Sequence, residues 1–348
     1  MTTKLQITTP DDWHLHLRDG PVMQSVLSYT SFWCKRAIVM PNLVPPVVTA
    51  AAAAAYRDRI TDALEEGGDF TPLMTLYLTE QTNADDLAAA VKGGIATAVK
   101  LYPAGATTNS ASGVKDINKV MPVLEVLAET GAPLLVHGEV SDPNIDIFDR
   151  EAIFIERVLA PLHERLPQLK VVFEHITTRQ AVEFVMAAND QIAATVTPHH
   201  LIINRNAYLA GGIKPHYYCL PVAKRETHRL ALLDAVLAGT DKFFLGTDSA
   251  PHVDMAKLQP CGCAGIFNAP NTLACLAQLF DDAGCLDRLE GFTSVYGPQF
   301  YGLDVNTDKL TLVKHETPQP VPQPVQTTEG AITVFDPQMD VFWSVRPA

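Results

Sequence analysis

Short apolar runs rich in β-branched residues alternate with longer segments rich in Ala, Leu and Glu over most of the chain. The short runs are typical of buried strands, and the longer segments are typical of helices. The expected strands lie at residues 13–17, 37–40, 73–78, 97–101, 134–137, 171–175, 192–196 and 243–246. The expected helices lie at residues 49–65, 84–91, 115–129, 152–165, 178–188, 224–237 and 271–280.

Eight strand–helix repeats close into a barrel more readily than they form an open sheet, and about 250 residues is the usual size of such a barrel. We therefore expect an α/β fold of the TIM-type (β/α)8 barrel class, with residues 1–348 as a single domain. An open doubly wound sheet is the alternative. Neither Gly93-Gly94 nor Gly211-Gly212 lies in the G-x-G-x-x-G context that often accompanies that sheet, which disfavours a nicotinamide enzyme.

Two segments differ in composition from the repeats. Residues 105–113 (GATTNSASG) follow the fourth expected strand and are small and polar, which suits either a mobile lid or an ordinary surface connection. Residues 304–348 form a proline-rich C-terminal extension, in which PQPVPQPVQ is unsuited to a helix and ITVFD and VFWSV are β-like. We expect this extension to pack on the outside of the barrel, because Phe335, Phe342 and Trp343 would otherwise be exposed.

The charge balance narrows the classes of partner. The chain has 26 Lys and Arg residues against 39 Asp and Glu residues, a formal net charge of −13, and no basic stripe. This balance disfavours nucleic acid and anionic membranes as partners. A small anionic substrate would therefore need cationic groups concentrated in its pocket.

The N-terminal sequence and the cysteines indicate the compartment. The first residues, MTTKLQITTPDDW, lack the apolar region of a signal peptide, and no window reaches the ~18 consecutive apolar residues of a membrane span. We therefore expect a cytoplasmic protein. Six cysteines without a C-x-x-C pattern are typical of reduced thiols, and we expect Cys261 and Cys263 to be bystanders rather than a metal pair.

Polar and apolar residues alternate in the first expected strand. A period of two places His14, His16 and Arg18 on one face, and Trp13, Leu15 and Leu17 on the other. In a barrel we expect the apolar face to meet the helices and the polar face to point into the barrel mouth. Two imidazoles there can bind one metal ion while Arg18 offers its guanidinium to a carboxylate. Taken alone, His-x-His is also compatible with a hydrogen-bonded pair on an exposed strand.

Three further strands end on potential ligands. The fifth and sixth expected strands end on His137 and His175, and the eighth is followed by Asp248. The carboxyl ends of parallel strands meet at one mouth of a barrel, where the active sites of such folds lie. Four histidines and one aspartate at these positions predict a metal site.

Lys100 lies in the fourth expected strand, where alternation points it toward the same mouth. Burial beside cations would depress its pKa and leave a neutral amine. A neutral amine can add carbon dioxide to form a carbamate, whose two oxygens could bridge two metal ions. The alternative is a lysine that binds substrate or pairs with a carboxylate such as Glu139.

Other polar residues near strand ends are more ambiguous. Asn42 follows the second expected strand and His252 lies four residues past Asp248, so each is either a hydrogen-bond donor at the site or an ordinary loop residue. His199 and His200 follow the seventh expected strand, and we expect hydrogen bonding or packing rather than ligation for both.

The motifs WHLHLRDG, MPNL, VKLYP, LLVHGE, FEHI and GTDSAPH together resemble the amidohydrolase superfamily. Within it they are similar to the dihydroorotase family of the shorter, single-domain bacterial type, across all eight expected strands. The resemblance implies that His14, His16 and Asp248 bind the more buried of two zinc ions and that His137 and His175 bind the other. It also implies that carbamylated Lys100 bridges both ions.

The resemblance further implies how a substrate is held. Arg18, Asn42 and His252 would bind its carboxylate, and backbone near Leu220 and Ala264 would contact its ring amides. Thr107 and Thr108 match the lid threonines of that family. A homodimer is also implied.

The implied reaction is the reversible cyclisation of N-carbamoyl-L-aspartate to L-dihydroorotate in pyrimidine biosynthesis. Two zinc ions would share a hydroxide, and Asp248 would act as general acid and base. The first alternative is another two-metal cyclic amidase, such as a hydantoinase or dihydropyrimidinase, from which Arg18 with Asn42 distinguishes the expected enzyme. The second is a non-catalytic barrel that serves as a binding partner. Cobalt or manganese would also suit the ligand set.

Overall fold

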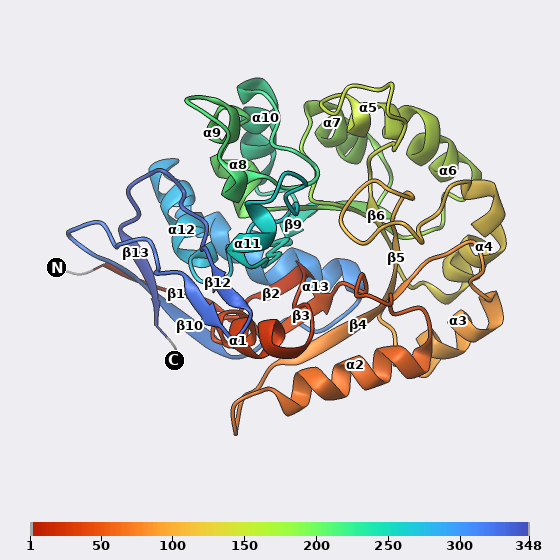
Figure 1. Ribbon diagram of the computed structural model, residues 1–348, viewed down its shortest axis with the longest axis horizontal. Helices are drawn as coiled ribbons and strands as arrows, with labels where there is room; N and C mark the ends of the chain where they lie inside the picture. The colour runs from red at the N-terminus through yellow and green to blue at the C-terminus, as the bar shows by residue number, and fades with distance from the viewer. Residues whose placement is uncertain (1–2, 347–348) are drawn as a thin grey trace.

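The computed structural model describes residues 3–346 and has an eight-stranded parallel sheet at its centre (Figure 1). The strands follow one another around the sheet in chain order. They are β2 (Asp11–Leu15), β3 (Arg36–Val39), β4 (Thr71–Tyr77), β5 (Ala98–Leu101), β6 (Leu134–His137), β7 (Val171–Glu174), β8 (Ile192–Val196) and β9 (Phe243–Leu245). The N–H of Asp248 donates to His14 O (2.9 Å), and the N–H of His16 donates to Ser249 O (3.1 Å). These bonds join the end of the first barrel strand, β2, to the segment that follows the last, β9. The fold is therefore the predicted α/β barrel.

Helices surround the strands (Figure 1). They are α1 (Gly20–Ser31), α2 (Ala50–Asp62), α3 (Ala84–Lys92), α4 (Met121–Thr130), α5 (Arg150–Phe154), α6 (Ala160–Arg165), α7 (Arg179–Ala187), α8 (Pro198–Ile202), α9 (Asn206–Leu209), α10 (Glu226–Leu237), α11 (Asp254–Lys257), α12 (Thr272–Asp282) and α13 (Tyr296–Tyr301). Within residues 3–346, none of the helices combines the length and the apolar character needed to cross a membrane.

Helix α1 was not predicted. Its cap is Asp19, whose carboxylate accepts from the N–H of Gly20, and a proline lies in the first turn. The predicted helix at 152–165 is in fact α5 and α6 joined by a π-helical turn at Ile155–Leu159. Pro161 lies just after this turn and has no N–H to donate to the preceding turn, which accounts for the irregularity.

The interior of the barrel is apolar in its lower half. Ala98, Leu135, Val172 and Phe244 come from four different strands and pack together with Trp13. Residues from separate parallel strands can meet in this way only inside the barrel. Two residues further along three of these strands, the inward direction belongs to the polar side chains of Lys100, His137 and Glu174, so this end of the interior can carry chemistry.

The prediction that Trp13 faces the helices with Leu15 and Leu17 was wrong. Leu15 and Leu17 pack in the outer core, but Trp13 lies in the interior cluster and stacks on Tyr301 of α13 at 4.2 Å between ring centroids. The pairing of β2 with β3 shifts register between Asp12 and Leu15, so strict alternation fails at this point.

The C-terminal extension packs on the outside of the barrel together with the N-terminal strand. Strand β10 (Lys309–Lys314) pairs antiparallel with β1 (Thr3–Thr8) on one side and with β13 (Trp343–Arg346) on the other. These strands lie side by side near both chain ends (Figure 1). A hairpin of β11 (Val325–Thr327) and β12 (Gly330–Ile332) completes the extension. Trp343 and Phe335 are buried as expected, and Phe342 is half-buried.

Candidate active site

The polar side chains singled out from the sequence meet at the carboxyl end of the barrel. Eleven of the thirteen predicted site residues line one pocket there. They are His14, His16, Arg18, Asn42, Thr107, Thr108, His137, His175, Leu220, Asp248 and Ala264. Of the other two, Lys100 is fully buried on the same inward face and His252 contacts Arg18.

Backbone turns at the strand ends direct two of these side chains. His175 and Asp248 have φ values of 42° and 44°, in the left-handed region that non-glycine residues rarely adopt. The N–H of His175 donates to Thr195 Oγ1 at 2.7 Å, and the N–H of Asp248 donates to His14 O at 2.9 Å. These bonds hold both residues in this conformation. Such strained backbone persists only where the surrounding structure fixes it, and it is concentrated at functional sites.

Three ligand atoms converge at the end of β2. His14 Nε2 lies 3.2 Å from His16 Nε2 and 3.4 Å from Asp248 Oδ1, and His16 Nε2 lies 3.2 Å from the same oxygen. A tetrahedral metal ion with bonds of about 2.0–2.1 Å holds its ligand atoms roughly 3.3–3.4 Å apart. The spacing and the chemistry of this group therefore fit a divalent metal ion.

The protonation states agree with ligation. Burial lowers the pKa of His14 and lowers that of His16 to about 3, so both imidazoles are neutral. Burial alone would raise the pKa of Asp248, but its contacts with His14 and His16 outweigh this and hold the pKa well below its usual range. Neutral imidazole and ionised carboxylate are the forms that bind metal.

Two more histidines lie beside this group. The His175 ring is 4.8 Å from that of His14 and 4.9 Å from that of His137, between centroids. His175 Nδ1 is buried without a hydrogen-bond partner among the described residues. His137 Nε2 contacts Glu139 Oε2 at 3.0 Å, which leaves its other ring nitrogen for a ligand. This second pair of imidazoles therefore lies beside the first group of potential ligands.

Lys100 pairs with Glu174, which the sequence analysis did not single out, rather than with Glu139. Both side chains are fully buried. Burial lowers the pKa of Lys100 well below its usual value. Glu174 Oε1 also lies 2.9 Å from His14 Nδ1, although not in line for a hydrogen bond. The sequence did contain a signal for Glu174. It lies two residues past the inward-facing Val172 and so points inward in a strand that is otherwise apolar.

Asn42 links a ligand histidine to the loop that covers the pocket. His16 Nδ1 donates to Asn42 Oδ1 at 2.9 Å, because an amide oxygen can only accept. This bond leaves the lone pair of His16 on Nε2, facing His14 and Asp248. The amide nitrogen of Asn42 donates to Thr108 O at 3.2 Å.

The loop at 105–113 crosses the mouth of the pocket. Thr108 Oγ1 donates to Ala264 O at 3.4 Å on the opposite rim. Asn109 Nδ2 donates to Asn42 O at 3.0 Å. In this conformation the loop covers the pocket.

A guanidinium lies at the rim. Arg18 Nε donates to Pro251 O at 3.0 Å, and Arg18 Nη2 donates to His252 Nε2 at 2.9 Å. Burial lowers the pKa of His252, and the neighbouring Arg18 lowers it further, so this imidazole is neutral; its Nε2 also lies 3.1 Å from Ala264 O. Arg18 is therefore held in place with donors left over for an anion.

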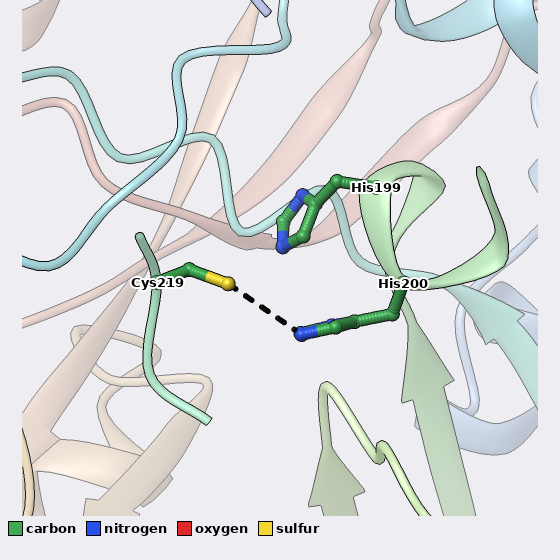
Figure 2. A group of neighbouring side chains, drawn as sticks. All are labelled: His199, His200 and Cys219. Carbon is green, nitrogen blue, oxygen red and sulfur yellow. Dashed lines mark hydrogen bonds between the residues drawn. The ribbon is translucent and has the colours of Figure 1, made fainter. Parts of the chain in front are cut away.

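Figure 2 shows a second buried group of potential metal ligands, His199, His200 and Cys219. His200 Nε2 lies 3.0 Å from Pro221 O, which can only accept, so this nitrogen carries the proton. Asn268 Nδ2 donates to a neighbouring backbone carbonyl (2.8 Å) and to His199 Nδ1 (3.0 Å), so the His199 proton is on Nε2. His200 thus turns an N–H toward Cys219 Sγ at 3.6 Å, while His199 Nε2 has no hydrogen-bond partner among the described residues. Burial raises the pKa of Cys219 to about 12, so its thiol is neutral, and the thiolate is the form that binds metal. We therefore interpret this group as a cluster of neutral side chains rather than a metal site.

Proteins of known sequence and structure share this architecture. Residues 11–311 match the model of the amidohydrolase family. A protein from Chelativorans sp. (strain BNC1) named dihydroorotase is 61% identical over 342 residues, which cover 98% of this chain and 99% of that protein. A dihydroorotase from Saccharomyces cerevisiae, solved in complex with 5-fluoroorotic acid, superposes with a TM-score of 0.91 at 30% identity. One from Campylobacter jejuni superposes with a TM-score of 0.90 at 33% identity, and each comparison covers 99% of this chain and 98% of the other.

Proposed function

The chain belongs to the amidohydrolase family, and we propose that it is a dihydroorotase, which interconverts N-carbamoyl-L-aspartate and L-dihydroorotate in pyrimidine biosynthesis. The observation that carries this proposal is one pocket that joins a metal-ligand cluster to a guanidinium at its rim. The near full-length identity to proteins of that name supports the same assignment.

We propose two divalent ions, zinc by preference, as the cofactor. His14, His16 and Asp248 would hold one ion, and His137 and His175 the other. A carbamate on Lys100 would be a further ligand: burial lowers the pKa of this amine and so favours the neutral form that adds carbon dioxide, while its pairing with Glu174 favours the charged form. When bound, the ions polarise the ring amide carbonyl and lower the pKa of water enough to supply hydroxide at neutral pH.

The residues of the chain then position the reactants and move the proton. In ring opening, Asp248 accepts the proton of the attacking water and passes it to the departing amide nitrogen. Its low pKa keeps it ionised at neutral pH. In ring closure the same carboxylate works in reverse and donates to the departing oxygen.

Arg18, Asn42 and His252 would bind the carboxylate of the substrate. Arg18 is already fixed by two hydrogen bonds, so little side-chain freedom is lost on binding. The backbone at Leu220 and Ala264 would hold the ring amides. Thr107 and Thr108, on the loop over the pocket, would exclude water from the reaction.

We propose that the chain forms one barrel domain with residues 304–348 as its extension. We also propose that it is a homodimer and that it lies in the cytoplasm. Size-exclusion chromatography with light scattering tests the dimer, which predicts twice the 37.9 kDa chain mass.

A comparison of ring substrates tests the function. L-dihydroorotate, dihydrouracil and hydantoin share a cyclic amide, but only the first bears a carboxylate. The proposal predicts efficient hydrolysis of L-dihydroorotate and little or none of the two uncharged rings. Faster turnover of an uncharged ring would favour a hydantoinase or dihydropyrimidinase, and no turnover of any ring by metal-loaded protein would favour a non-catalytic barrel.

A further inference from the structure

Lys257, at the end of α11, is a buried cation that the proposed reaction does not use. It is 5% exposed. Its ammonium donates to three backbone carbonyls, of Tyr218 (3.1 Å), Cys263 (3.1 Å) and Gly265 (2.5 Å). An ammonium has three N–H donors, so each is used.

These three carbonyls belong to the two segments that present backbone to the pocket. Tyr218 lies two residues before Leu220, and Cys263 and Gly265 flank Ala264. Leu220, Ala264 and Gly265 all line the pocket. One side chain outside the pocket thus ties together both walls that would contact the substrate ring.

The bonds to Lys257 also set the direction of one carbonyl. Successive carbonyls of an extended segment point to opposite sides. Those of Cys263 and Gly265 point to Lys257, and that of Ala264 points the other way, toward Thr108 Oγ1 at 3.4 Å. The Ala264 oxygen therefore faces the pocket because its two neighbours face the ammonium.

Other contacts also hold this segment, among them those of Ala264 O with Thr108 Oγ1 (3.4 Å) and His252 Nε2 (3.1 Å). The N–H of Gly265 donates to Tyr218 O at 3.0 Å, and the N–H of Cys263 donates to Ala256 O at 3.1 Å. Gly265 has a φ of 152°, and a Cβ there would lie 2.6 Å from Ala250 O, so the segment passes the barrel rim in a backbone form that requires glycine. Without the ammonium, the carbonyls of Cys263 and Gly265 would lose the donor that orients them.

We infer that Lys257 is a positioning residue for substrate recognition: it aims the Ala264 carbonyl and the Leu220 segment at the N–H groups of the substrate ring. This inference rests on the proposed function for the identity of the ring. Ala264 O would accept from a ring N–H, and an acceptor turned away would weaken binding of substrate and transition state alike. Such a loss raises KM and leaves kcat nearly unchanged.

The test compares Lys257→Met with a matched control. Lys242 makes the same kind of contact, donating to the carbonyls of Val185 (3.3 Å), Ala188 (2.6 Å) and Asn189 (3.0 Å), but it precedes β9 at the opposite end of the barrel. Lys257→Met is expected to raise KM for L-dihydroorotate about 10-fold, with kcat within threefold and metal content unchanged. Lys242→Met is expected to leave KM within twofold. Lys257→Arg, which keeps the charge and donors, should restore part of the affinity.

Two outcomes overturn the inference: a folded Lys257→Met protein with unchanged KM, or an equal rise in KM in Lys242→Met. If Lys257→Met does not fold, Lys257→Gln, which keeps two N–H donors, takes its place under the same criteria. Amide hydrogen exchange gives a readout that does not need turnover, and the peptide covering 263–265 should exchange faster in the Lys257 variant only. If the wild-type protein does not hydrolyse L-dihydroorotate, the proposed function fails, and the exchange experiment still decides whether Lys257 holds this segment.

Discussion

Replacement of Arg18 by methionine should abolish recognition of the substrate carboxylate while leaving the metal site intact. Arg18 Nε and one hydrogen of Nη2 are committed to Pro251 O and His252. Nη1 and the second Nη2 hydrogen remain for a carboxylate, enough for two charge-assisted hydrogen bonds at about 1.5–3 kcal/mol each. Loss of both corresponds to about 3–6 kcal/mol, or roughly 100- to 20,000-fold in kcat/KM.

The assay is the initial rate of L-dihydroorotate hydrolysis, measured beside metal content and the urea midpoint of unfolding. Arg57→Met is the control, because the Arg57 side chain on α2 is 43% exposed and its hydrogen bonds in the described structure go to the neighbouring Asp58. Arg18→Lys keeps the charge but not the forked geometry and should fall between the two. The reasoning is refuted if Arg18→Met keeps kcat/KM within threefold of wild type while its metal content is unchanged.

Three further predictions follow from single contacts. Asn42→Leu removes the acceptor that orients His16, so metal affinity should fall about 10- to 100-fold, as measured by competition with a chelator. Glu151 is fully buried and accepts from two backbone N–H groups just past His175. Glu151→Ala leaves both N–H groups buried without an acceptor, at about 1–3 kcal/mol each, so the free energy of unfolding measured in urea should fall by about 2–6 kcal/mol. Cys219→Ser should leave the number of bound metal ions unchanged. Loss of one ion per chain would contradict the conclusion that His199, His200 and Cys219 do not bind metal.

Hydrophobic patterning located the barrel strands closely. Two of the expected strands, 134–137 and 192–196, coincide with β6 and β8, and the others differ by at most two residues at either end. Strands buried on both faces are short apolar runs with sharp ends, which is why their positions can be inferred without a template. The same hydrophobic patterning located the site, because polar residues at the carboxyl end of an otherwise apolar strand are hard to explain by packing alone.

The errors have local causes. Trp13 was assigned to the outer face because alternation was assumed through a register shift that no sequence pattern marks. Strand β1 was missed because its partner, β10, lies more than 300 residues away along the chain. Glu174 was passed over beside the more conspicuous His175. Lys257 carries no motif at all, because backbone carbonyls, which every residue has, are its partners.

Metal titration of the stripped protein tests the central claim most directly. The rate of L-dihydroorotate hydrolysis should be near zero without metal and should rise with added zinc, in the presence of bicarbonate, to a plateau at two equivalents per chain. Full activity in metal-free protein, a plateau at one equivalent, or no hydrolysis at any zinc concentration would contradict a two-metal site built from His14, His16, His137, His175 and Asp248.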